Sequence, residues 1–188
     1  RPVKMVMSRD EVFRASGPAC GTSMQVKVGA TREGKITAGD ATLKFQAGAF
    51  AGSPVPAGAM CAFAPYDLEH VRSVGYDVLV NRPKVAAYRA PGAPLGEYAV
   101  ESVIDELAKT LELDPIEFRL LNAVREGVDS SYGPKFGPIG CIQTLEAARD
   151  HDHYQAPLGS GQGRGVASGY WFNIGGQTSA TLNLSEDG

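Results

Sequence analysis

The chain has 188 residues and a formal net charge of −3, from 18 Lys and Arg against 21 Asp and Glu. Its 43% hydrophobic and 21% charged residues are typical of a globular protein, which excludes a disordered chain and a protein embedded wholly in a membrane. The basic residues form no cluster, so the sequence argues against a nucleic-acid partner.

The three cysteines, Cys20, Cys61 and Cys141, lie far apart and include no CxxC pair. A sparse, odd number of cysteines suits a reducing compartment better than a disulfide framework, so we expect a cytoplasmic protein. No signal peptide opens the chain, and its first residue is Arg1 rather than Met. We therefore expect the sequence to be a piece of a longer protein.

The first part of the chain predicts strands. Residues 2–7 alternate imperfectly between apolar and polar side chains, which favours a half-buried strand. Residues 23–30 and 35–45 alternate on either side of a turn at 32–34, which is the pattern of a β-hairpin. We expect one face of this hairpin to be covered, with five side chains contributing to it: Val26, Val28, Ile36, Ala38 and Leu43.

Residues 45–66 carry no charge, and their length would suffice for a membrane span of about 20 residues. Their composition argues against a membrane helix, because Pro54, Pro56 and Pro65 would interrupt it and Leu and Ile are absent. We expect a buried irregular loop and no contact with a membrane. Since the backbone polar groups of such a loop need partners, it is a candidate wall of a cofactor site.

A strand is expected at 71–80, and two helices follow. The second helix begins at Asp114, an N-cap residue that precedes a proline, and would end at Gly127. Phe118 and Leu121 would pack this helix against its neighbours. The apolar residues of the first helix recur at helical spacing and define its buried stripe: Val100, Val103, Ile104, Leu107, Ala108 and Leu111.

Residues 127–138, rich in glycine and proline, separate this helix pair from a weaker helix around Leu145, and strands are expected at 166–172 and 178–184. The order of elements favours an α+β fold with mixed or antiparallel strands and a packed helix pair. We place a domain boundary near residue 130, which gives a first domain at 1–130 and the beginning of a second at 131–188.

Several polar motifs favour structural roles. The glycine-rich residues 159–165 would lead into a strand rather than a helix, so we expect a linker and no nucleotide site. His151 and His153 lie at a helix end without a third ligand, which favours surface histidines over a metal site. No serine or cysteine is set as a nucleophile. Three acidic residues are expected on the solvated side of the long helix: Glu101, Asp105 and Glu106.

Arg89 differs from the other charged residues. It follows a short apolar stretch and directly precedes a turn that contains Pro91, Gly92 and Pro94, and no carboxylate lies within seven residues on either side. A guanidinium fixed in this way has the fork geometry that suits a phosphate or a polar heterocycle. The alternative, on the residues alone, is a structural ion pair with a distant carboxylate.

The sequence Ala-Tyr-Arg-Ala-Pro-Gly-Ala-Pro at 87–94, followed by 99–102 and 113–122, resembles the molybdopterin-binding subunit of the xanthine dehydrogenase and aldehyde oxidase family. The match joins a site loop to two helices at fixed spacing, and residues 1–11 and 163–165 add to it. The resemblance spans nearly the whole chain. It implies that the α+β fold is part of a molybdenum-cofactor-binding fold.

This family implies a molybdenum hydroxylase, an oxidoreductase that hydroxylates an aldehyde or an N-heterocycle with water as the oxygen source. The cofactors would be molybdenum held by molybdopterin, with iron–sulfur clusters and FAD on partner subunits or domains. The partners would be these subunits, the remaining segments of the large subunit and a small-molecule substrate. The family's glutamate base would lie outside these 188 residues, so we expect this piece to be inactive alone.

By the same resemblance, Arg89 would contact the molybdenum cofactor, and its neighbours Tyr88, Ala90, Pro91 and Gly92 would contact the substrate. No catalytic residue and no metal ligand is assigned within the chain. Pro91 occupies the place of an aromatic residue in xanthine-oxidising members, which argues against a purine substrate. Ala90 stands where carbon monoxide dehydrogenases carry a cysteine, which argues against a copper-bridged site.

Two further expectations concern the whole chain. Strands left unpaired at both ends would favour self-association through their edges. The alternative function is a stand-alone binding or interaction module that has the fold without redox chemistry. A hydrolase or an isomerase is disfavoured, because no nucleophile or acid–base pair is evident.

Overall fold

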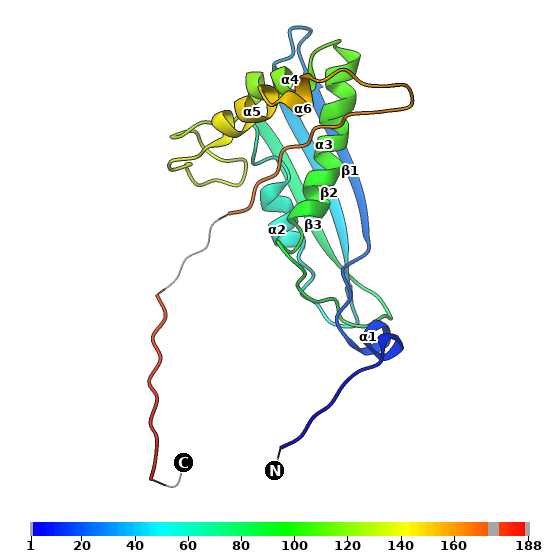
Figure 1. The fold of residues 1–188 in the computed structure, drawn as a ribbon, viewed down its shortest axis with the longest axis vertical. Helices are drawn as coiled ribbons and strands as arrows, with labels where there is room; N and C mark the ends of the chain where they lie inside the picture. Colours follow the sequence, from blue (N-terminus) through cyan, green and yellow to red (C-terminus); the bar gives the residue numbers. More distant parts are fainter. Residues whose placement is uncertain (1, 173–176, 187–188) are drawn as a thin grey trace.

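The computed structural model describes residues 2–172 and 177–186. Its centre is a sheet of three strands, β1 (Thr22–Ala30), β2 (Ile36–Gly48) and β3 (His70–Leu79), in the order β1-β2-β3 (Figure 1). β1 and β2 are antiparallel, whereas β2 and β3 are parallel. The predicted hairpin and the strand at 71–80 are confirmed, and the mixed sheet with its helices confirms the α+β class.

One face of the sheet is buried, and a bulge decides which residues lie on it. Gly29 pairs with Ala38 whereas Ala30 pairs with Ile36, so β2 has one extra residue at this point. Ala38 lies on the open face, and its prediction as a core residue was wrong because alternation does not foresee a bulge. The other four hairpin residues predicted for this face do pack in the core: Val26, Val28, Ile36 and Leu43.

Two helices cover the buried face. α2 (Val55–Cys61) lies between β2 and β3 in the chain, and α3 (Ala93–Thr110) runs along the sheet (Figure 1). The prediction of an irregular loop at 45–66 was therefore wrong in part. Pro56 is tolerated in the first turn of α2, because no intrahelical hydrogen bond needs its N–H there. The apolar stripe of α3 is confirmed, and its innermost members are almost fully buried: Val100, Ile104 and Ala108.

α4 (Pro115–Asn122) begins as predicted, since the Asp114 carboxylate accepts two backbone N–H groups of its first turn. The helix ends at Asn122 rather than at Gly127. There the fully buried Asn122 side chain is hydrogen-bonded to the hairpin, a tertiary contact that overrides the local glycine signal. Phe118 is buried as predicted, but Leu121 is 51% exposed and lies at the edge of the core, close to Gly34.

Three short helices complete the described chain: α1 (Arg9–Ala15), α5 (Cys141–Arg149) and α6 (Asp152–Gln155). α5 confirms the weaker helix around Leu145. The strands predicted at 2–7, 166–172 and 178–184 are wrong, because none of these segments lies beside a strand with which it could pair. Within the described residues, no helix combines the length and the apolar character that crossing a bilayer requires.

Candidate functional site

The loop that carries Arg89 connects a buried residue, Val85, to the first turn of α3. Its backbone has positive φ angles of 20° at Arg89, 51° at Ala90 and 89° at Gly92, of which only the first two are unfavourable. Left-handed conformations cost energy at residues that carry a Cβ and concentrate where a protein meets a ligand. The conformation of the loop is therefore a first indication of a binding site.

The loop is held against the start of α2 by a close backbone contact. A Cβ atom on Gly92 would lie 2.1 Å from the carbonyl oxygen of Pro54, so only glycine fits at this position. A neighbouring glycine makes a similar approach, since a Cβ on Gly96 would lie 2.5 Å from the carbonyl oxygen of Gly58. These contacts fix where the Arg89 loop lies relative to α2 and α3.

A cavity of about 440 Å³ lies beside this loop. All five residues that the sequence analysis proposed as site residues line it: Tyr88, Arg89, Ala90, Pro91 and Gly92. The rest of the wall is largely apolar and includes Pro54 from the uncharged segment 45–66 and Leu95 from α3. Burial raises the pKa of the Cys20 thiol, which lines the cavity as a neutral group.

Arg89 is the only charged residue among those that line this cavity. Its side chain is exposed and makes no ion pair or hydrogen bond with any other described residue. The structural carboxylate pair considered as the alternative is therefore absent from the described part of the chain. The arrangement is a free guanidinium at the rim of an apolar cavity, able to hold an anion or a polar ring edge.

A buried polar network includes Glu101 of α3, for which a solvated position was predicted from the sequence. Glu101 is 6% exposed and forms an ion pair with Arg119, which is completely buried, at 2.8 Å. The Tyr66 hydroxyl donates a hydrogen bond to Glu101. Burial and the Glu101 charge raise the pKa of Tyr66 well above its usual value, so this hydroxyl stays a donor.

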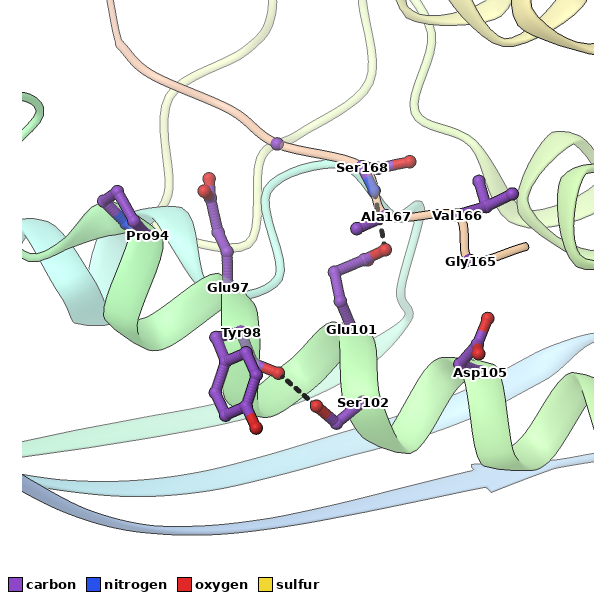
Figure 2. Close-up of a pocket in the computed structure, with 11 residues that line it drawn as sticks. Pro94, Glu97, Tyr98, Glu101, Ser102, Asp105, Gly165, Val166, Ala167 and Ser168 are labelled. Carbon is purple, nitrogen blue, oxygen red and sulfur yellow. Dashed lines mark hydrogen bonds between the residues drawn. The ribbon is translucent and has the colours of Figure 1, made fainter. Parts of the chain in front are cut away.

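The expectation of a solvated Glu101 was thus wrong, although Glu106 is exposed as expected and Asp105 is half exposed. A signal for Glu101 was present, since it lies three residues before Ile104 and seven before Ala108, within the buried stripe of α3. Glu97, one turn earlier, is half-buried and lines a second cavity together with Glu101 (Figure 2). Sequence reasoning did not single out Glu97.

The structure places the remaining polar motifs at the surface or in hydrogen bonds with the backbone. His151 and His153 are exposed, and His151 accepts a hydrogen bond from the backbone of His153 at the start of α6. No group of metal-ligating side chains is found among residues 2–172 and 177–186. Residues 159–165 are irregular and exposed apart from Arg164, whose guanidinium donates hydrogen bonds to the backbone oxygens of Tyr154 and Ala156.

Comparison with known proteins gives concordant matches. The family model described as the molybdopterin cofactor-binding domain matches residues 1–123. The nicotinate dehydrogenase large molybdopterin subunit of Eubacterium barkeri is 33% identical over 154 residues, which cover 80% of this chain and 36% of that subunit. The putative xanthine dehydrogenase molybdenum-binding subunit of Escherichia coli is 31% identical over 152 residues, with 79% of this chain and 20% of that protein covered.

Comparison with solved structures also finds a similar fold, that of an aldehyde oxidoreductase. The aldehyde oxidoreductase of Desulfovibrio desulfuricans superposes with a TM-score of 0.66 and 29% sequence identity, and the match covers 74% of this chain and 16% of that one. The chain therefore spans about a third of the first of these relatives and a fifth or less of the other two.

Proposed function

This chain belongs to the molybdopterin cofactor-binding domain family, and we propose that it forms part of the large subunit of a molybdenum hydroxylase. In this proposal the loop at 88–92 contributes to a wall shared by cofactor and substrate. The observation that carries it is that the five consecutive residues of this loop line one cavity, in which Arg89 is the only charged lining residue: Tyr88, Arg89, Ala90, Pro91 and Gly92. The activity would be the oxidative hydroxylation of an aldehyde or an N-heterocycle with water as the oxygen source.

The residues present fit a molybdopterin cofactor. Arg89 offers a planar set of donors without a competing carboxylate in the described chain, which suits the phosphate or the ring heteroatoms of a pterin. When bound, the cofactor supplies the metal at which the substrate is oxidised. The role of Arg89 is to bind and orient the cofactor, and the role of the apolar wall is to exclude water.

The same wall bears on the substrate. Tyr88, Ala90, Pro91 and Gly92 are assigned to substrate contacts, and the small, apolar residues among them favour a flat or slender apolar molecule. Pro91 provides no ring for stacking, which disfavours a purine. No catalytic base is assigned in this chain, since Glu97 and Glu101 line a different cavity.

The proposal includes the partners of such an enzyme. These are further segments of a large subunit, a second molybdopterin-binding domain that begins near residue 131, and iron–sulfur and FAD subunits or domains. The site of action is the cytoplasm. Self-association through the open sheet edges is part of the same proposal.

The test is substitution of Arg89 in the complete polypeptide that contains this sequence, produced together with its partner subunits. Arg89→Met should lower the molybdenum and pterin content about tenfold or more, because the charge-assisted hydrogen bonds are lost. Arg82→Met is the matched control, since Arg82 is an exposed arginine of a neighbouring loop that lines no cavity near Arg89. Metal analysis and pterin fluorescence measure the content.

Two results would contradict the proposal. Unchanged cofactor content and unchanged kcat/KM in Arg89→Met would remove the role of Arg89. Absence of molybdenum from the unaltered complete protein would remove the enzyme assignment and favour the binding-module alternative. The 188-residue chain alone is expected to retain no molybdenum and to oxidise nothing.

A further inference from the structure

The segment at 165–171, here called the strap, crosses α3 in an extended conformation and separates two cavities. Residues 165–169 line the cavity of about 510 Å³ that faces Glu97 and Glu101. Residues 166–171 line a second cavity of about 420 Å³ that has no charged residue in its wall, and the opposite wall includes Val124, Phe136 and Leu145. No described strand pairs with the strap, and side chains form hydrogen bonds with its backbone at Val166, Ser168 and Tyr170.

Two carboxylates of α3 accept hydrogen bonds from backbone N–H groups of the strap. Ser168 N donates to Glu101 Oε2 at 2.6 Å, and Tyr170 N donates to Glu97 Oε1 at 2.6 Å. Glu97 and Glu101 are one helical turn apart, about 6 Å, which matches the spacing of about 6.6 Å between alternate residues of an extended chain. Figure 2 shows both carboxylates directed from α3 toward the strap.

The two carboxylates differ in charge compensation. Glu101 is paired with Arg119, which also donates to Val166 O at 2.8 Å, so the inner half of the strap is held by a neutralised network. Glu97 forms no ion pair with a basic side chain in the described residues. It is half-buried beside a second carboxylate, an environment that disfavours its ionised form.

The two titratable groups outside α3 that face Glu97, the Cys61 thiol and the Tyr170 hydroxyl, stay neutral near pH 7. Burial, with the charge of Glu97, raises the pKa of the Cys61 thiol on α2 to about 11. Burial and its hydrogen bond with Tyr132 raise the pKa of the Tyr170 hydroxyl on the strap above its usual value. On α3 itself, Glu101 is already compensated by Arg119.

We propose that the contact between Glu97 and Tyr170 is a pH-sensitive latch for the outer half of the strap, residues 169–171. This half docks on α3 while Glu97 is protonated, because the neutral carboxyl still accepts the Tyr170 N–H. Ionisation of Glu97 releases it, while residues 166–168 stay anchored to Glu101 and Arg119. Release opens the apolar cavity beneath Tyr170 and Trp171.

The direction of the pH dependence follows from the thermodynamic linkage between the protonation of Glu97 and the docking of the strap. Burial raises the pKa of the docked Glu97 to about 7, with Glu101 adding to the rise and the Tyr170 N–H opposing it. When the strap leaves, Glu97 meets water and its pKa falls toward the ordinary value of 4.5. The released fraction should therefore rise by about tenfold per pH unit between these two values and level off above pH 7.

Amide hydrogen exchange of the unaltered chain, corrected for the intrinsic pH dependence of exchange, measures this equilibrium residue by residue. The protection of the Tyr170 amide is expected to fall as the pH rises from 5 to 7 by about tenfold per unit and then to stay constant. The Ser168 amide, held by Glu101, is the internal control and should keep its protection. Quenching of Trp171, the only tryptophan in the chain, should increase over the same range.

The variant Glu97→Gln provides a second test of the proposal. The amide carbonyl of its Gln side chain accepts the hydrogen bond from Tyr170 N–H at every pH. This variant should show high Tyr170 protection without pH dependence, and Glu106→Gln, an exposed site on the same helix, should behave as the unaltered chain. A pH dependence that persists in Glu97→Gln overturns the proposal. So does a Tyr170 protection that is constant or rises with pH in the unaltered chain, a measurement that needs no variant to fold.

Discussion

At the level of single residues, the ion pair between Glu101 and Arg119 is the contact that depends most on both of its partners, because both charges are buried. Arg119 is completely buried, and its guanidinium also donates to the backbone oxygens of Pro115 and Val166. Replacing one partner would leave a buried charge without compensation. The pair therefore links α3, α4 and the strap at 165–171.

Glu101→Gln should lower the free energy of unfolding by about 3–5 kcal/mol, because Arg119 would remain charged in a buried site. Urea denaturation of the purified chain measures this change. Asp105→Asn is the matched control, since Asp105 lies 3.6 Å from the same guanidinium but is 48% exposed, and it should cost about 0.5 kcal/mol or less. Equal losses in the two variants would contradict the assignment.

Single residues were predicted unevenly from the sequence, for physical reasons. Arg89 could be selected as a candidate because its local setting, a proline turn without nearby carboxylates, is encoded in adjacent residues, and its role in binding stays a prediction. The burial of Glu101 depends on Arg119, which lies 18 residues away and reaches it only once α4 packs on α3. Glu97 depends on a backbone N–H of Tyr170, 73 residues away, which no local pattern indicates.

At the scale of elements, the contact between α2 and α3 rests on glycines. A Cβ atom on Gly96 would lie 2.5 Å from the Gly58 carbonyl oxygen, and backbone cannot move aside as a flexible side chain can. Gly96→Ala should therefore lower the free energy of unfolding by about 1–3 kcal/mol despite its better helix propensity. Thermal unfolding measures the loss.

Gly137→Ala is the control for this substitution, since a Cβ at Gly137 meets no atom within 4 Å. It should change the free energy of unfolding by about 0.5 kcal/mol or less. If Gly96→Ala left the free energy of unfolding unchanged, α2 and α3 would be able to move apart without an energetic cost. In that case the position of the Arg89 loop would not depend on their contact.

The N-cap of α4 contributes to the stability of the whole fold. Asp114→Ala should cost about 1 kcal/mol, because two backbone N–H groups lose their acceptor. Ser8→Ala removes a comparable cap from α1, which buries no residue, and should leave the global free energy of unfolding unchanged. Urea midpoints of the two variants separate these outcomes, and equal midpoints would contradict the distinction.

Elements were predictable where local pattern and tertiary packing agree. The stripe of α3 and the cap of α4 belong to this group. Residues 2–7 and 178–184 have strand-like alternation but no neighbouring strand, so they form no ladder. α2 was missed because it is only seven residues long and contains Pro56 and Gly58, which weaken the local helix signal, and because its stability comes from packing against β2 and β3.

At the scale of the whole molecule, the sheet has two open edges. The outer edges of β1 and β3 pair with no strand in the described part of the chain. β3 in addition exposes apolar side chains near its end, with Leu79 60% and Val78 36% exposed. Such an edge offers a template for pairing with another chain.

The isolated chain is accordingly expected to self-associate as its concentration rises, which sedimentation velocity measures. Val78→Lys should weaken the association, because a charge on an edge strand opposes edge-to-edge pairing. Val3→Lys, a substitution at a 91% exposed residue outside the sheet, is the control and should leave it unchanged. A strictly monomeric chain at high concentration would contradict this expectation.

The architecture as a whole followed from the order of elements, but the site did not. The mixed sheet and the helix pair could be expected from alternation and helical spacing. The cavity beside Arg89 required the position of Pro54 against Gly92, a contact between residues far apart in sequence. The family resemblance located this loop because it carries information that single-residue patterns lack.

The buried Asn122 side chain also constrains the order in which the protein can mature on the ribosome. It accepts a hydrogen bond from Ile36 N and donates one to Gly34 O, groups made 86 and 88 residues earlier in synthesis. Until α4 emerges from the exit tunnel, the hairpin turn keeps polar backbone groups that only water can satisfy. Nascent chains stalled before residue 122 should therefore remain protease-sensitive at this turn, and longer ones should acquire resistance in a single step.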